Sequence, residues 1–305
     1  MTLVTVDPYP VAALAALFDD GLPAAGPGDP VPPYWHLAAC ALPPPTGALG
    51  PDGHPRAGLV SAPPGLPRRM FAGGRLSALD TIRVGERLER AQRITASTDK
   101  RGRSGPLRFC TTESVFRRPG GDPVLVEEQD IVYRAAGAPS GAPAGAPSGA
   151  PAGAPSGASA GVPAARGAET GAGDGPGRLL TRPGEPLRAV FRADAVALQR
   201  FSAATANPHR IHYDQPYVTS VEGYPGLVVH GPLLLLSMLE LIRLDLPDLA
   251  VTGVRFRAQA PVFAGDAVDL SGERRPGGVR LTARLAGAPP GAADAMTVEC
   301  ATGPA

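Results

Sequence analysis

Three of the five histidines of this chain, His209, His212 and His230, fall in two neighbouring segments. The first segment, FSAATANPHRIHYD over 201–214, is rich in hydrogen-bonding groups, and the second, GLVVHGPLLLLSMLELI over 226–242, is strongly apolar. Imidazole titrates near neutral pH, so a histidine can accept or release a proton during a reaction. A polar segment next to the start of a buried helix brings such groups and free backbone donors to one point. The two segments therefore indicate acid/base chemistry.

The bulk composition excludes several classes of protein. The 305 residues include 29 basic and 28 acidic side chains, so no net charge favours nucleic acid or a membrane surface as a partner. Cys40, Cys110 and Cys300 are widely spaced and lack a CxxC pair, which predicts free thiols in a reducing compartment. The N-terminus lacks a basic region before its apolar residues, and the longest apolar run, at 233–242, is too short to cross a bilayer. We therefore expect a soluble, cytoplasmic protein.

The first half of the chain has a few helical signals followed by strand signals. A short amphipathic helix is predicted over 8–20, and Pro33 is a suitable first residue for a second helix. Strands are predicted over 88–97, 107–117 and 124–134, with a Pro-Gly-Gly turn between the last two. Helices followed by long antiparallel strands indicate an α+β class.

A low-complexity segment of Ala, Gly, Pro and Ser then interrupts the pattern over 135–177. It contains the octad APSGAPAG twice and has no apolar face, so we expect a disordered linker between residues 1–134 and 178–305. The second half resumes with a strand over 187–192, a helix that Asp194 can cap, and strands over 251–258, 267–274, 279–285 and 296–301. A buried helix followed by an antiparallel meander, occurring twice, predicts a double hot-dog fold, with two helix-wrapped antiparallel sheets.

The segments FSAATANPHRIHYD, YPGLVVHGPLL and RFRAQAPVFAGD resemble the MaoC-like (R)-specific enoyl-thioester hydratases and dehydratases. The form T-x-N-x-H-x-I-H-Y-D followed by EGYPGLVVHGPL is similar to the hydroxyacyl-thioester dehydratase type 2 branch, which includes mesaconyl- and itaconyl-CoA hydratases. The first half resembles the same branch through PPYWH, GRSGPLRF and VEEQDIVYR. The chain departs from the general motif, because Thr205-Ala206 replace Ser-Gly and His209-Arg210 replace Asn-Pro. The most important departure is Asn207, which stands where the family has its catalytic Asp.

The resemblance implies reversible hydration of an enoyl thioester, with His212 as the catalytic acid/base. Asn207 has no useful proton affinity, so we expect it to orient the water while His212 transfers the proton. Gly231 precedes Pro232 at the start of the apolar helix, where a free N–H suits a thioester oxyanion, and the resemblance implies the same role. Structural alternatives remain: His212 could brace a loop, and Gly231 could simply permit tight entry into the helix.

Four further residues complete the candidate site with less defined roles. His209 could face the pocket or the surface, His230 could order the helix start, Asp214 could orient a loop, and Thr205 could hydrogen-bond locally. In the first half, His36 and His54 stand isolated in the sequence. We expect that half to supply an acyl-binding groove while only the second half carries the chemistry.

A short basic segment of the first half, Lys100, Arg101 and Arg103, could meet a phosphate of the substrate or form a solvated strand connection.

The expected partner is an acyl-CoA or acyl-carrier-protein substrate, which carries its own CoA or phosphopantetheine. No metal site and no other cofactor is expected, since no carboxylate or cysteine cluster accompanies the histidines. Nucleic acid and membrane are not expected as partners, and a homodimer is compatible with the sequence. Two other functions stay open, a non-catalytic acyl-thioester-binding module and a hot-dog thioesterase.

Overall fold

A computed structural model describes residues 1–305 except 57, 103–104, 136–176, 290 and 305. The elements of the first half are β1 (Thr2–Thr5), α1 (Pro8–Phe18), α2 (His36–Ala39), the 3-10 helix η1 (Thr46–Ala48), β2 (Arg68–Ala78), β3 (Arg87–Gly102), β4 (Gly105–Arg117) and β5 (Pro123–Arg134). The elements of the second half are β6 (Leu180–Thr181), β7 (Arg188–Phe191), α3 (Ala195–Ala204), η2 (Arg210–His212), α4 (Gln215–Ser220), α5 (Gly231–Asp245), β8 (Leu249–Ala258), β9 (Val268–Arg275), β10 (Gly278–Leu285) and β11 (Met296–Pro304).

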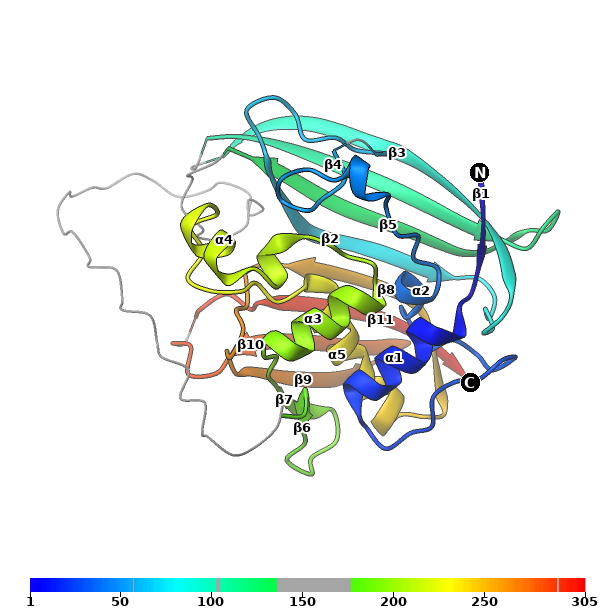
Figure 1. The fold of residues 1–305 in the computed structure, drawn as a ribbon. Coiled ribbons are helices and arrows are strands. Elements are labelled where there is room, and N and C mark those ends of the chain that lie inside the picture. Colours follow the sequence, from blue (N-terminus) through cyan, green and yellow to red (C-terminus); the bar gives the residue numbers. More distant parts are fainter. Residues whose placement is uncertain (57, 103–104, 136–176, 290, 305) are drawn as a thin grey trace.

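All described strands belong to one antiparallel sheet of 11 strands, in the order β1-β3-β4-β5-β2-β8-β11-β10-β9-β7-β6. The two halves meet at the β2–β8 pair, where Leu76 lies opposite Val254. Figure 1 shows the strands of the first half above those of the second, with the join between them. The α+β double hot-dog architecture predicted from the sequence is confirmed.

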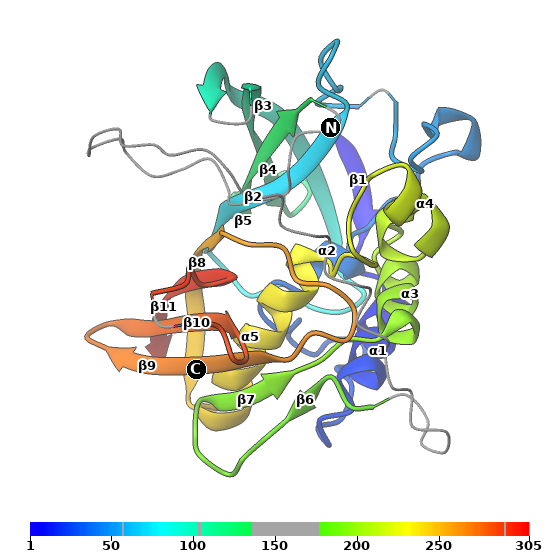
Figure 2. The same ribbon diagram turned by 90° about the vertical axis from the view of Figure 1, so that its left-hand side faces the viewer.

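Helix α5 fills the concave face of the C-terminal half. Pro232 occupies the first turn, where its missing N–H is no loss. Its residues from Leu233 to Ile242 are all buried, which explains why this stretch is apolar on every side. Figure 2 shows α5 between the strands β8–β11 and the pair α1 and α3.

The second helix of the first half, predicted to start at Pro33, begins at His36 and is short. Helix α2 contains four residues, His36–Ala39, and prolines at 43–45 follow closely. The neighbouring side chains make buried hydrogen bonds. The Tyr34 hydroxyl donates to Glu127 of β5 at 2.9 Å within the first half, and Trp35 Nε1 donates to Glu240 of α5 at 3.2 Å, which joins the two halves. The backbone of Tyr34 has a φ of +70°, a strained conformation for a bulky residue.

Strand β2 was missing from the sequence-based prediction. Its centre contains Gly73 and Gly74, which do not resemble strand residues. A Cβ on Gly73 would lie 2.7 Å from the Phe256 carbonyl oxygen, so glycine permits the close approach of β8. The sequence therefore predicted only β8 of the two strands that join the halves.

The predicted linker over 135–177 lies outside the described residues except at its two ends. Strand β5 ends at Arg134, and the first strand of the second half begins at Leu180. The three cysteines are free, as predicted, and all three are buried. Among the described residues, no helix is long and apolar enough to cross a membrane.

Candidate active site

Helix α3 and the turn after it place the motif residues. Asp194 caps the helix by accepting from the Ala197 N–H at 2.8 Å, as the sequence predicts. The helix ends at Ala204, and Ala206 adopts a left-handed φ of +49°, which turns the chain back toward α5. The 3-10 helix η2 follows and ends on His212.

His212 is buried and has a defined tautomer. Its Nδ1 lies 2.7 Å from the carbonyl oxygen of Val228, and a carbonyl can only accept, so Nδ1 carries the proton. The neutral ring then presents Nε2 as a proton acceptor. Burial lowers the pKa of His212 to about 4, although the bond to Val228 opposes the shift. The imidazole is therefore neutral at pH 7 and ready to act as a base.

Four of the five histidines form a continuous row of rings, His54, His209, His212 and His230. The rings of His212 and His230 stack with centroids 3.5 Å apart. His209 meets the edge of His212 at 5.6 Å and that of His54 at 5.6 Å. Burial and the neighbouring imidazoles lower the pKa of His209 to about 2 and that of His230 well below its ordinary value. We call this set the histidine row.

The histidine row includes a residue of the first half, so His54 is not isolated as the sequence suggested. His54 lies in the loop over 50–54, which we call the docking loop. Arg210 donates its backbone N–H to the Asp52 carbonyl at 2.8 Å and its Nη1 to the Pro51 carbonyl at 2.9 Å. Gly53 has a φ of +82°, and a Cβ there would overlap the carbonyl oxygen of Pro208. The loop therefore packs on the segment that carries His209 and His212 through a contact that only glycine allows.

Sequence reasoning missed the docking loop because no local motif marks it. Its Pro-Asp-Gly pattern predicts a turn but says nothing of what the turn contacts. His36, also isolated in the sequence, lies away from this row and approaches Glu127 at 3.4 Å.

Three other predicted residues have structural contacts. The Asn207 Oδ1 accepts from the His209 N–H at 3.1 Å, and Thr205 donates to the Phe201 carbonyl at 2.7 Å. Asp214 caps α4 by accepting from the Tyr217 N–H at 3.0 Å and also binds Arg210. Each of these residues stabilises the loop that carries His209 and His212. The amide nitrogen of Asn207 is not used in the contact with His209.

Gly231 is the first residue of α5, directly after His230. Its N–H has no acceptor within the helix and lies at the positive end of the helix dipole. A Cβ on Gly231 would lie 2.6 Å from the ring of Phe71 on β2. His230 is held by Ser202, whose Oγ lies 2.9 Å from its Nε2. The oxyanion donor predicted from the sequence thus sits beside the stacked pair of His212 and His230, with Phe71 of the first half against it.

The basic segment at the end of β3 has no contact with this site among the described residues. Lys100 is exposed and lies over the ring of Phe109, with 4.9 Å from Nζ to the centroid. Arg103 lies outside the described residues.

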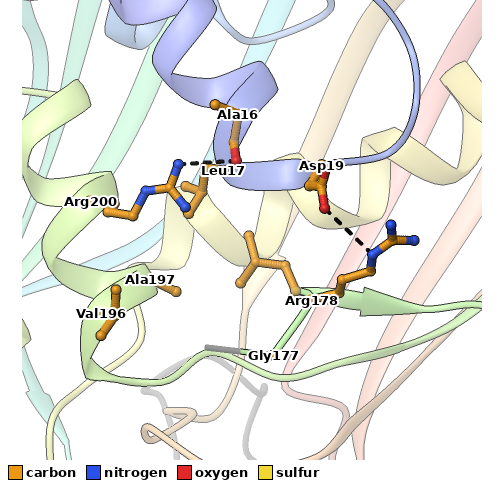
Figure 3. Close-up of a pocket in the computed structure, with 9 residues that line it drawn as sticks. Ala16, Leu17, Asp19, Gly177, Arg178, Val196, Ala197 and Arg200 are labelled. Atoms are coloured by element: carbon orange, nitrogen blue, oxygen red, sulfur yellow. Dashed lines mark hydrogen bonds and ion pairs between the residues drawn. The ribbon is translucent and has the colours of Figure 1, made fainter. Parts of the chain in front are cut away.

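A cavity of about 120 Å³ lies where α1 meets α3 and contains none of the candidate residues (Figure 3). Arg200 donates to the Ala16 carbonyl there at 3.0 Å, and Arg178 approaches Asp19 at 3.5 Å. The Arg200 contact joins α3 to α1, and the Arg178 contact joins the segment before β6 to the end of α1. Within the described part of the chain, no group of three or more His, Cys, Asp or Glu side chains is arranged to hold a metal ion.

Comparisons with known proteins identify the family of the chain. The family model of hydroxyacyl-thioester dehydratase type 2 matches residues 34–155 and 178–264. A mesaconyl-C(4)-CoA hydratase from Chloroflexus aurantiacus is 38% identical over 288 residues, which cover 90% of each chain.

Solved structures support the fold. A MaoC-like dehydratase from Phytophthora capsici has a TM-score of 0.58 at 16% identity and covers 99% of this chain and 93% of its own. A Mycobacterium tuberculosis protein described as having a double hot-dog fold has a TM-score of 0.53 at 17% identity, over 99% of this chain and 94% of its own.

Proposed function

Because this chain belongs to the hydroxyacyl-thioester dehydratase type 2 family, a family of hydro-lyases, we propose that it adds water reversibly to an enoyl thioester to give the 3-hydroxyacyl thioester. The observation that carries the mechanism is the 2.7 Å bond between His212 Nδ1 and the Val228 carbonyl. That bond leaves Nε2 without a proton and so makes His212 the base that activates water.

The reaction needs one proton acceptor and one proton donor, and His212 serves as both in turn. Its Nε2 removes a proton from water while the oxygen of that water bonds to the β-carbon of the enoyl group. The electron pair of the carbon–carbon double bond moves to the α-carbon and the thioester oxygen. The imidazolium of His212 then returns a proton to the α-carbon, so the histidine ends neutral.

The negative charge that develops on the thioester oxygen is stabilised by the N–H of Gly231. This donor is fixed at the start of the 15-residue helix α5 before the reaction begins, so it needs no reorganisation. Asn207 directs its amide N–H groups at the water, since its Oδ1 is already engaged by the His209 N–H. The proposed steps consist of proton transfers and hydrogen bonds by this chain, and the substrate brings its own CoA or phosphopantetheine.

The substrate is an acyl thioester small enough to enter between the two halves. Phe71 and the docking loop of the first half border the reacting groups, so this half forms one wall of the acyl site. Mesaconyl-C4-CoA, the substrate named for the Chloroflexus relative, is the first compound to test, with crotonyl-CoA as a four-carbon comparison lacking a carboxylate.

The decisive experiment follows the absorbance of the enoyl-thioester band with each compound, for the wild type and for His212→Ala. Loss of the band with the wild type alone, without release of thiol, is the expected result. Release of thiol would identify a thioesterase, and an unchanged band with bound substrate would identify a binding module. Full activity of His212→Ala would contradict the role assigned to His212.

A further inference from the structure

His230 is a buried histidine that has no role in the reaction steps described above. It is 1% exposed and directly precedes Gly231, the first residue of α5. Its ring stacks on His212 with centroids 3.5 Å apart and an angle of 18° between the planes, and it meets the ring of Phe201 at 4.9 Å. These contacts restrict the orientation of the His230 imidazole.

The two nitrogen atoms of the His230 ring have different surroundings. Nε2 lies 2.9 Å from the Oγ of Ser202 on α3. Nδ1 is enclosed and has no hydrogen-bond partner among the described residues. Buried polar atoms are almost always paired, and a catalytic role is one explanation for an exception.

The pairing of Ser202 with His230 indicates which ring nitrogen carries the proton. If Nε2 carried it, Nε2 would donate to Ser202, and both the Ser202 hydroxyl hydrogen and Nδ1 would lack partners in the part of the chain that the structure describes. If Nδ1 carries the proton, the Ser202 hydroxyl donates to Nε2 and only the Nδ1 N–H is unpaired. The second arrangement leaves fewer buried groups unpaired, so Nδ1 is a hydrogen-bond donor without an acceptor.

The Nδ1 donor lies on the side of the ring that faces its own backbone. Nδ1 is bonded to the ring carbon that carries Cβ, whereas Nε2 is on the far side of the ring, against Ser202 of α3. The Gly231 N–H belongs to the peptide group that directly follows His230. Two donors so close along the chain can reach one oxygen atom, and oxyanion sites use such fixed donors where negative charge develops.

We propose that His230 is a second catalytic donor to the thioester oxygen, with its Nδ1–H acting beside the N–H of Gly231. This inference rests on the proposed function and adds a residue to it. A neutral imidazole can polarise a carbonyl without giving up its proton. Burial and the neighbouring His212 lower the pKa of His230, which keeps the ring uncharged. The two stacked histidines thus have separate roles, since His212 transfers protons and His230 only donates a hydrogen bond.

Substrate entry has to expose both donors. Nδ1 of His230 is enclosed, and the ring of Phe71 is so near that a Cβ on Gly231 would lie 2.6 Å from it. Phe71 belongs to the first half of the chain and is partly exposed. We expect its ring to turn away from Gly231 as the thioester enters.

The test measures the carbonyl group of a bound thioester, so it does not depend on turnover. Butyryl-CoA with an isotope label on the thioester carbon is saturated and cannot be hydrated. Hydrogen bonds to the carbonyl oxygen lower its stretching frequency, which difference infrared spectroscopy of the bound ligand records. We expect binding to the wild type to shift this band to lower frequency.

Two variants of His230 separate the hydrogen-bond donor from the stacked ring. His230→Phe keeps a ring against His212 but has no donor, so the carbonyl shift should be clearly smaller. His230→Asn loses the ring but its amide nitrogen provides a donor near the position of Nδ1, so most of the shift should remain. With crotonyl-CoA, His230→Phe should lower kcat by about 10²–10³-fold with little change in KM, the usual effect of losing one oxyanion donor, and His230→Asn should lower it less.

The control is His36→Phe, which replaces another buried histidine whose Nδ1 has no partner among the described residues. His36 contacts Glu127, so this variant should keep the wild-type carbonyl shift. An equal shift in the wild type and His230→Phe would overturn the inference. So would a shift that persists in His230→Phe and is lost in His230→Asn, because His230 would then act through its stacked ring. Either His230 variant is informative alone if circular dichroism shows that the other does not fold.

Failure of the proposed function would look different from failure of this inference. A protein that shifts the butyryl-CoA carbonyl, loses that shift in His230→Phe and leaves the enoyl band of both unsaturated thioesters unchanged would have the two donors without the activity. A protein that hydrates crotonyl-CoA equally well before and after His230→Phe would have the activity without this donor.

Discussion

At the scale of single residues, the central feature is that His212 is neutral and fixed in one tautomer. Its imidazole is 7% exposed and hydrogen-bonded through Nδ1 to Val228. Burial stabilises the uncharged ring, so the base form persists to lower pH than it would in water. The same burial makes the imidazolium a strong acid, which favours the return of the proton to the α-carbon.

The pKa of His212 predicts the acid limb of the pH profile. Only the unprotonated ring is a base, so kcat/KM should be constant from pH 8 to about pH 5 and fall as the pH drops through about 4. Initial rates of hydration across this range, with circular dichroism to confirm that the protein stays folded, provide the measurement. An acid limb near 6.5 would mean that the essential base is solvated and is not His212.

The separate roles proposed for His212, which transfers the proton, and Asn207, which orients the water, give a second prediction. His212→Ala should lower kcat by about 10³-fold or more, because no other group takes the proton. Asn207→Asp should lower it by less than about 10²-fold. Aspartate loses the amide N–H groups, but one oxygen keeps the bond from the His209 N–H and the other can accept a hydrogen bond from the water and so still orient it. Both kcat values come from the same absorbance assay. Equal losses in the two variants would contradict separate roles for these residues.

At the scale of elements, sequence and structure agree where a signal is local. The cap at Asp194, the buried helix over Gly231–Asp245 and the three free cysteines all follow from residue types and spacing. His212 and Gly231 were found through two motifs, each continuous in sequence. The structure places them at one site, because the His212 ring stacks on that of His230 and Gly231 directly follows His230.

Features that depend on contacts between the halves were not predictable. His54 is 155 positions from His209 in the sequence, yet the two rings meet at 5.6 Å. Phe71 lies on β2, whose glycines hide its strand character. Periodicity describes how a segment buries one face, and it does not say which distant segment covers that face.

The docking loop provides an element-scale prediction through Gly53. Alanine at this position would overlap the Pro208 carbonyl and also require a φ of +82°, so the loop should move away from the catalytic segment. We expect kcat/KM to fall by about tenfold or more, since small displacements of reacting groups are costly. The matched control is Gly85→Ala, which has a φ of +86° but no atom within 4 Å of the new Cβ.

Comparing the two glycine variants distinguishes the effect of backbone strain from the effect of losing the contact between the docking loop and Pro208. Thermal unfolding should show a strain cost in both, of about 1–2 kcal/mol. Activity should fall only in Gly53→Ala. Equal activity in the two variants would show that the docking loop does not position the histidine row.

At the scale of the whole molecule, the two halves share one sheet and one set of buried polar contacts. Tyr34 binds Glu127 within the first half, and Trp35 reaches Glu240 in the middle of α5. Glu240 is 1% exposed and also binds Arg243. The Trp35–Glu240 contact connects the chain beside the short α2 of one half to the long α5 of the other. It buries an ionisable group, Glu240, whose protonation affects folding.

Two sets of buried groups have opposite effects on stability as the pH falls. Folded His212 has a pKa of about 4 against about 6.5 when unfolded, so acidification from pH 7 to pH 5 protonates the unfolded chain first and costs about 2 kcal/mol. The lowered pKa values of His54, His209 and His230 act in the same direction. Burial raises the pKa of Glu240 to about 7, so its protonation on acidification favours the folded state.

The combined effect of the histidine row on stability should exceed the opposite effect of Glu240. The free energy of unfolding should therefore decrease as the pH falls from 7 to 5. Glu240→Gln removes the opposing contribution while keeping an acceptor for Trp35, so this variant should lose more stability than the wild type over the same interval. Urea unfolding at pH 7, 6 and 5, followed by circular dichroism, measures both curves. At pH 7 the two proteins differ also by the lost charge pair with Arg243, so the comparison concerns the slope with pH and not the absolute value. Parallel slopes would show that Glu240 is still ionised at pH 5 in the folded protein. The charge of Arg243 would then lower the pKa of Glu240 by more than burial raises it.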